Sequence, residues 1–172
     1  MKDPQIPTPR IDASAVISPA SHIYGDVTIG ADSFVLFGAV IRAELDQITL
    51  GAETNIQDNV VLHCDQGIPC RIGDRVTVGH SAVIHGANLG DRSLIGIGAK
   101  VLNRSSVGDG AWVGAGSVVT EGKQIPPWTL AIGTPARPVR DLNEDEIRRA
   151  DDGVDHYLQL ASLYREIFSN TD

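Results

Sequence analysis

The stretch LIGIGAKVLNRSSVGDGAWVGAGSVVTEGKQI, residues 94–125, places an aliphatic residue at every sixth position. These positions are Ile95, Val101, Val107, Val113, Val119 and Ile125. Leu89 extends this run by one position toward the N-terminus. The same spacing occurs in three earlier runs, which interruptions of the period separate: Ile11, Ile17, Ile23, Ile29, Val35 and Ile41; Leu50, Ile56 and Leu62; and Ile72, Val78 and Ile84. A fixed short period of this kind indicates a repeat architecture in which each unit stacks on its neighbours.

Small residues and glycines occupy fixed places within each repeat. A small residue usually lies four places after the aliphatic one, as at Ala39, Ala99 and Ala111, and glycine often follows the aliphatic residue directly, as at Gly96. One large inward residue followed by a tight corner is typical of short strands that form a triangular coil, three units to a coil. A β-sandwich would instead alternate with period two and carry turn signals about every 8 to 12 residues. The sequence therefore predicts an all-β fold, a parallel β-helix of hexapeptide repeats.

The pattern changes after residue 140. Asn143 has the chemistry of a helix N-cap, and three acidic residues follow it, as favours a helix start. Gly153 is expected to interrupt this helix. Apolar residues then recur at helical spacing, at Val154, Tyr157, Leu158, Ala161, Tyr164 and Phe168. We expect a repeat domain over residues 1–140 and a C-terminal helical segment over residues 141–172 that packs on the β-helix.

Composition and charge argue against several classes of function. The formal charge is −8, from 14 basic and 22 acidic residues, and the arginines are scattered, so a nucleic-acid partner is not expected. No apolar run is long enough to span a membrane, and Met1–Gln5 lacks the apolar core of a secretory signal, so the expected compartment is the cytoplasm. The two cysteines, Cys64 and Cys70, are too few for a disulfide scaffold and are expected to be free thiols.

The repeat also predicts which side chains are neighbours. Residues three units apart lie one coil apart on the same side, at about 4.8 Å. Arg42, His63 and His85 each directly follow an aliphatic position and are each one coil apart, so they form one outward column. Asp58 and His80 lie two places after Ile56 and Val78, and they form a second column on another side.

Two histidines stacked at strand spacing can bind one metal ion, because two nitrogens on a tetrahedral zinc lie a little over 3 Å apart, roughly. His80 cannot reach His63 and His85 within one chain. In a homotrimer about an axis parallel to the coils, His80 of a neighbouring chain would complete the site. Three neutral imidazoles leave a fourth position for water, as in catalytic zinc sites. Zn²⁺ is the expected ion, and imidazole ligands also suit Fe²⁺ and Co²⁺.

The same arithmetic pairs Arg42 with Asp58. Each lies one coil below its histidine, Arg42 below His63 and Asp58 below His80. A trimer that brings His80 to the metal therefore brings Asp58 opposite Arg42, and we expect an intersubunit salt bridge beneath the site.

Five short motifs resemble the γ-class carbonic anhydrases: Arg42-Ala43-Glu44, Asn55-Ile56-Gln57-Asp58, Leu62-His63, Val78-Gly79-His80 and Ile84-His85-Gly86. The resemblance covers nearly the whole chain. It implies a left-handed coil, metal sites shared across the interfaces of a homotrimer, and reversible hydration of carbon dioxide to bicarbonate by metal-bound hydroxide. The metal would supply that hydroxide at neutral pH, because it lowers the pKa of its water to about 7.

The resemblance also implies roles for further residues. Gln57 would hydrogen-bond the metal-bound water or hydroxide, and Arg42 and Asp58 would organise the site with Asn55 behind them. For Asn55, corner chemistry is an equally good reading. Tyr157 matches an active-site tyrosine on the tail helix of some members, with core packing as the alternative.

The sequence departs from the family pattern at two places. Glu44 stands where the family usually has aspartate, which puts a carboxylate on a longer stem. The loop 64–70 is short and carries one acid, so it lacks the acidic insertion that holds the proton shuttle in some members. Slow or undetectable turnover is the expected consequence.

Two other classes of function remain open from sequence. The first is an acyl-CoA enzyme, because hexapeptide-repeat proteins include acyltransferases and thioesterases, and the stretch 133–137 recurs in acyltransferases. The second is a non-catalytic protein, since some similar sequences carry a ferric-siderophore-binding label or serve as structural subunits. Retention of all three histidines together with Gln57 favours an enzyme.

Overall fold

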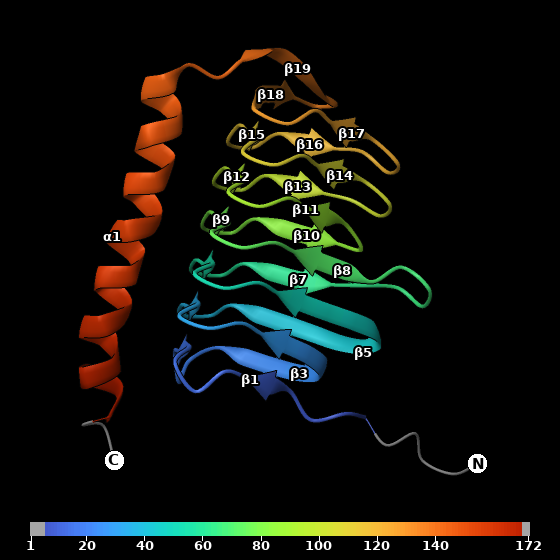
Figure 1. Ribbon diagram of the computed structural model, residues 1–172. Coiled ribbons are helices and arrows are strands. Elements are labelled where there is room, and N and C mark those ends of the chain that lie inside the picture. Colours follow the sequence, from blue (N-terminus) through green and yellow to red (C-terminus); the bar gives the residue numbers. More distant parts are fainter. Residues whose placement is uncertain (1–5, 170–172) are drawn as a thin grey trace.

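A computed structural model describes residues 6–169, and it is a stack of triangular coils with one helix alongside (Figure 1). The expected domain boundaries extend to residues 1–5 and 170–172, which lie outside the described residues. The expectation that Met1–Gln5 is not a secretory signal concerns the same undescribed residues. The predicted fold class is confirmed: a parallel β-solenoid of hexapeptide repeats followed by a C-terminal α-helix. Among residues 6–169 no helix combines the length and apolarity needed to cross a membrane.

The strands form two sheets. The 11-stranded sheet contains β1 (Arg10–Ile11), β3 (His22–Ile29), β5 (Val40–Leu50), β7 (Val61–His63), β8 (Cys70–Ile72), β10 (Val83–His85), β11 (Asn88–Leu89), β13 (Lys100–Val101), β14 (Ser106–Val107), β16 (Val118–Val119) and β17 (Gln124–Ile125). The 8-stranded sheet contains β2 (Val16–Ile17), β4 (Phe34–Val35), β6 (Asn55–Ile56), β9 (Thr77–Val78), β12 (Leu94–Ile95), β15 (Trp112–Val113), β18 (Thr129–Gly133) and β19 (Ala136–Asp141).

The larger sheet makes two sides of the triangle because β5 turns a corner. Its residues 40–42 pair with β7, and its residues 48–50 pair with β8. We call the side with β7, β10, β13 and β16 the first side, and the side with β8, β11, β14 and β17 the second. The 8-stranded sheet is the third side. Pairing is parallel throughout the coils, and β18 with β19 closes the far end as an antiparallel hairpin.

The aliphatic positions form the core, as the period predicts. From Ile29 to Ile125 each of them is buried, and they make one continuous hydrophobic cluster. Ile11 is 41% exposed and Ile17 and Ile23 are partly exposed, because the first coil is covered on one face only. The small corner residues Ala39, Ala99 and Ala111 are fully buried.

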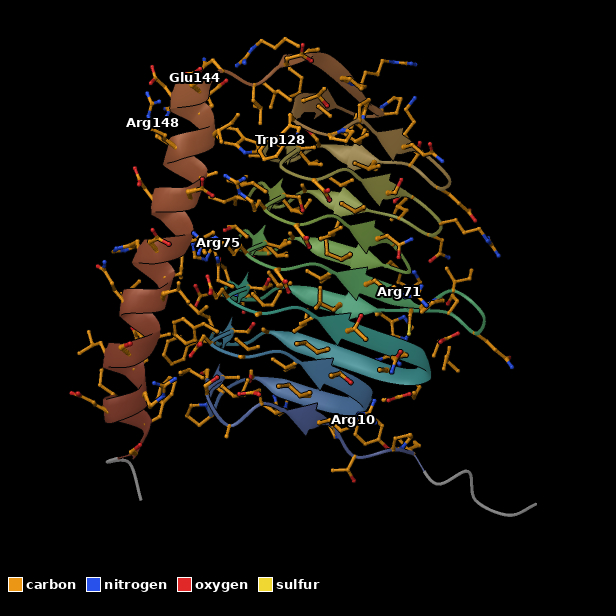
Figure 2. All side chains as sticks on the ribbon, viewed as in Figure 1. Arg10, Arg71, Arg75, Trp128, Glu144 and Arg148 are labelled. Carbon is orange, nitrogen blue, oxygen red and sulfur yellow. The ribbon has the colours of Figure 1, made fainter. Side chains whose placement is uncertain are left out.

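The helix α1 (Glu144–Ser169) lies along the third side of the solenoid (Figure 1). Its buried residues Val154 and Ala161 face the sheet, and Ala161 packs in a cluster with Phe34 of β4. Salt bridges also hold it to the corners: Arg75, which lies between the solenoid and the helix in Figure 2, is 2.8 Å from Asp155. The expected interruption at Gly153 is wrong, since α1 continues through it. Glycine inside a helix costs only about 1 kcal/mol, which the packing of this face offsets.

A capping box begins α1, as the N-cap assignment of Asn143 predicts. The backbone N–H of Glu146 donates to Asn143 Oδ1 at 2.9 Å, and the backbone N–H of Asn143 donates to Glu146 Oε2 at 3.0 Å. Arg140 donates to both carboxylate oxygens of Glu146, each at 2.7 Å. The hydrogen bonds from Arg140 and then from Asn143 lower the pKa of Glu146 from 4.5 to about 2.

We predict that Glu146→Gln lowers the melting temperature near neutral pH and that this loss fades in acid. The pKa of Glu146 is depressed in the folded state, so its stabilising effect is present above the unfolded pKa and disappears as pH falls through about 2. Thermal unfolding of both proteins across this range measures the effect. Glu144→Gln, exposed in the same first turn, is the control. A loss of equal size at every pH would contradict the prediction.

Candidate metal centre

His63 and His85 stack on the first side. Parallel pairing places Arg42 beside His63 and His63 beside His85, one coil apart, so the predicted column is confirmed. The stack has its rings 4.9 Å apart between centroids, and His63 Nδ1 lies 2.9 Å from His85 Nε2. Two ring nitrogens at this separation need only a small adjustment to ligate one tetrahedral ion.

The environment of His63 favours the neutral ring that metal binding requires. Burial lowers the pKa of His63, and the nearby positive charges of Arg42 and His85 lower it further. The other ring nitrogen, Nε2, lies 3.3 Å from Glu44 Oε1. Glu44 also forms an ion pair with Arg42 in the same chain. The longer stem of Glu44 thus lets one carboxylate contact both Arg42 and the imidazole.

Asn103 contacts the ring nitrogen of His85 that does not face His63. Asn103 Oδ1 lies 2.7 Å from His85 Nδ1, and Asn103 Nδ2 donates to Asp65 Oδ2 at 2.8 Å. Within the described residues, the group of side chains that could hold a metal ion is His63, Asp65 and His85. His80 is absent from this group, in agreement with the prediction that it cannot reach the other two histidines within one chain.

His80 lies at the corner that follows β9, between the third and first sides. Its Nδ1 is 2.8 Å from Asp58 Oδ2, one coil away, so the second predicted column is also confirmed. The side chain of His80 is 42% exposed, whereas that of His63 is 13% exposed. His80 therefore points its ring outward, where another molecule can approach it.

Gln57 and Asn55 form a buried chain of amides beside His80. Gln57 Nε2 donates to Asn55 Oδ1 at 3.1 Å, and Asn55 Nδ2 donates to Thr77 Oγ1 at 2.9 Å. The backbone N–H of His80 donates to Gln57 Oε1 at 3.1 Å. Asn55 therefore orients Gln57, and Gln57 fixes the backbone at His80.

Tyr157 lies where the packing interpretation expects it. It packs against the cluster that joins α1 to the third side. Burial raises the pKa of Tyr157, and the negative charge of Asp58 adds to the shift. The tyrosine is therefore a packing residue that also lies within electrostatic range of the Asp58 corner.

The two cysteines are free and buried. Burial raises the pKa of Cys64 and raises that of Cys70 to about 12. A thiol whose pKa is raised reacts slowly with oxidants, since the thiolate is the reactive form. Burial thus favours an inert thiol at Cys64 over a redox-sensitive one.

Asp65 and Asn103 are the contacts that sequence reasoning missed. Asp65 was visible only as the single acid of the loop after His63. Asn103 lies two places after the aliphatic Val101, one coil from the corner that follows His85. The repeat arithmetic could have placed it near His85, but no spacing rule predicts that its amide would turn toward the imidazole.

The donor chemistry of each of the three histidines suits a divalent ion. Each has one ring nitrogen beside an oxygen acceptor of its own chain: Glu44 for His63, Asn103 for His85 and Asp58 for His80. Metal-binding histidines usually donate their second ring N–H to such a partner, which fixes the tautomer and the ring orientation. The remaining nitrogen of each ring is the one left to ligate.

Comparison with known proteins connects this arrangement to a family. A carbonic anhydrase of Geobacillus kaustophilus is 43% identical over 160 residues, covering 93% of this chain and 88% of that protein. A probable carbonic anhydrase of Methanocaldococcus jannaschii is 43% identical, covering 88% and 95%. Gamma carbonic anhydrase 2, mitochondrial, of Arabidopsis thaliana is 37% identical. The chain belongs to the γ-class carbonic anhydrase family. The resemblance carried by the five motifs is thereby confirmed.

Other matches are broader. The family model described as "Hexapeptide repeat of succinyl-transferase" matches residues 69–102 and 106–121. A solved structure of a putative acetyltransferase from Bacillus cereus superposes with a TM-score of 0.91, at 36% identity over 92% of both chains. The match to the Arabidopsis protein covers 91% of this chain but only 59% of that protein. Family membership therefore does not by itself choose the reaction.

Proposed function

We propose that this protein is a metal-dependent carbonic anhydrase of the γ class, which reversibly hydrates carbon dioxide to bicarbonate. The observation that carries the proposal is the stack of His63 and His85, with facing nitrogens 2.9 Å apart. Each ring also has an oxygen acceptor behind it, Glu44 or Asn103. A surface histidine pair without a function has no need of such support on both rings.

The ion would be held by His63 and His85 of one chain and by His80 of the next. Zn²⁺ is the proposed ion, and the imidazole donor set also suits Fe²⁺ and Co²⁺. When bound, the ion lowers the pKa of a coordinated water to about 7 and so supplies hydroxide at neutral pH.

Exposed apolar side chains support a homotrimer with these sites at its interfaces. Val61, two residues before His63, is 37% exposed on the first side, and Ile97 is 59% exposed at the corner one coil from His80. One exposed apolar side chain therefore lies near each part of the proposed site, Val61 near His63 and Ile97 near His80. Burial of these two surfaces against one another would remove both from water and bring His80 to the stacked pair.

The polar residues around the site orient the histidine rings and a water molecule. Gln57 Nε2 carries two hydrogens and donates one to Asn55, so the second is free to orient a water at the His80 corner. Glu44 and Asp58 hold the rings of His63 and His80 through their outer nitrogens. Tyr157 of α1 lies within electrostatic range of Asp58, whose negative charge adds to the effect of burial in raising the pKa of Tyr157. We propose the cytoplasm as the compartment, in keeping with the two free thiols.

Acyl transfer or thioester hydrolysis is the second candidate. A solved structure that is 36% identical to this chain is described as a putative acetyltransferase, which favours including this class in the test. A single histidine suffices for acyl transfer, whereas the proposed reaction requires all three, so the number of histidines needed for turnover separates these two. A metal-bound hydroxide could also hydrolyse a thioester, so the substrate that is turned over separates thioester hydrolysis from the proposed reaction.

The test is carbon dioxide hydration by protein of defined metal content, followed by stopped-flow with a pH indicator. We expect the rate to track bound metal and to fall at least about 100-fold in His85→Ala, because metal affinity falls with loss of a ligand. His22→Ala, an exposed histidine on the same sheet, is the control and should leave the rate unchanged. Activity that survives complete chelation, or turnover of acetyl-CoA in its place, would contradict the proposal.

A further inference from the structure

We propose that Asn103 is a positioning residue: together with Asp65 it fixes the tautomer of His85, so that the Nε2 lone pair of His85 faces the metal. The inference rests on the proposed metal site, and it concerns two residues that none of the family motifs contains. Its basis is a continuous chain of contacts, Asp65 to Asn103 at 2.8 Å and Asn103 to His85 at 2.7 Å.

The direction of each hydrogen bond follows from the chemistry of the partners. The carboxylate of Asp65 accepts only, so the amide group that faces it must be the Nδ2 donor of Asn103. This choice turns the amide oxygen Oδ1 toward His85. An amide oxygen also accepts only, so Nδ1 of His85 must carry the proton. In the neutral ring Nε2 is then unprotonated and free to ligate.

The fold provides space for this contact at Gly86. Gly86 has a left-handed backbone, with φ of +54°, directly after His85. A Cβ placed there would lie 2.4 Å from Asn103 Oδ1 and 2.8 Å from Ile68 Cγ2. Any side chain at this position would therefore displace the amide from His85 or move the loop that carries Asp65. Gly122 is a suitable comparison, since its φ is +68° and nothing lies within 4 Å of its Cβ position.

Nitrogen NMR of the metal-free protein, with labelled histidine, tests the tautomer directly. We expect the Nδ1–H form for His85 in the natural chain and a mixture of the two forms in Asn103→Leu. This measurement needs no metal. Nδ1 that is unprotonated in the neutral ring of the natural protein would overturn the inference.

Metal affinity provides the second test, with Co²⁺ as the probe in competition with a chelator and with its visible absorption as a readout of coordination. Asn103→Leu and Gly86→Ala should each weaken Co²⁺ binding about 10- to 100-fold, the usual effect of losing an outer-shell partner. Gly122→Ala has the same left-handed backbone and should not weaken it. Equal losses in Gly86→Ala and Gly122→Ala, or unchanged affinity in Asn103→Leu, would overturn the inference.

Exchanging the residue types at positions 65 and 103 distinguishes a positioning role of Asp65 from direct binding of the metal by Asp65. Asn103→Asp alone places two carboxylates face to face and should weaken Co²⁺ binding. Adding Asp65→Asn restores one donor and one acceptor with an acceptor still facing His85, so the double variant should recover most of the affinity. A double variant weaker than Asn103→Asp alone would make Asp65 itself a ligand and overturn the inference.

Different results would contradict the proposed reaction and the proposed role of Asn103. A natural chain that binds Co²⁺ tightly but hydrates no carbon dioxide would remove the proposed reaction and leave the role of Asn103 to the affinity series. A natural chain that binds no Co²⁺ would remove the metal site, and the tautomer of His85 in the metal-free protein would still decide whether Asn103 positions it.

Discussion

Mixing two variants that each fail to bind metal, His80→Ala and His85→Ala, should restore metal binding. The stacked pair and His80 lie on different sides of the solenoid, and the described residues of one chain do not bring them together. A chain that keeps His63 and His85 can therefore form an intact site with a neighbour that keeps His80. Each variant alone should lose metal affinity by at least about 100-fold, more than the loss expected for an outer-shell partner.

Random reassembly of the two variants fixes the expected amount. In a closed three-fold ring every mixed trimer contains one interface with all three histidines, so an equal mixture should recover metal at about one quarter of its sites. Metal analysis after unfolding and reassembling the mixture measures this fraction. His63→Ala mixed with His85→Ala is the control, because both variants lack a ligand from the same half and should recover none. Equal recovery in the two mixtures would contradict a site shared between chains.

The second large effect is expected for Arg42 and Asp58. In one chain Arg42 pairs with Glu44, and Asp58 contacts His80. Their side chains are 50% and 33% exposed, so both remain accessible to a neighbouring chain. A partly buried pair across the interface would leave an uncompensated charge when cut, at a cost of about 3–5 kcal/mol, whereas an exposed one is worth at most about 1 kcal/mol. We expect the larger value, because the interface that covers the metal also covers the level beneath it.

A double-mutant cycle measures this coupling. Arg42→Ala should weaken trimer assembly and metal retention together, and the double variant with Asp58→Ala should lose less than the sum of the two single losses. A second cycle, Arg42→Ala with Glu44→Ala, measures the coupling between Arg42 and Glu44 within one chain. Sedimentation and thermal unfolding provide the measurements. Fully additive losses in the first cycle, or an Arg42→Ala protein that remains a metal-loaded trimer of unchanged stability, would contradict the intersubunit pair.

The sequence was sufficient for the repeat and for the height of each histidine. A period of six fixes which residues point inward, and parallel strands stack without slip, so the column of Arg42, His63 and His85 followed from counting alone. The N-cap at Asn143 was likewise readable, because the capping box is local in sequence. Gly153 was misread, since the packing of α1 along the third side outweighs the local preference of one glycine.

Only the tertiary structure decided how the side chains around the histidines are connected. Asn103 reaches Asp65 across 38 positions in the chain, and Glu44 reaches His63 across 19. A repeat fixes the position of each Cβ atom, but the direction of a polar side chain depends on rotamers and on partners from other coils. The sequence by itself therefore determined the coil and the level of each ligand. The orientation of each imidazole, on which metal binding depends, is set by hydrogen bonds that form only when distant coils meet.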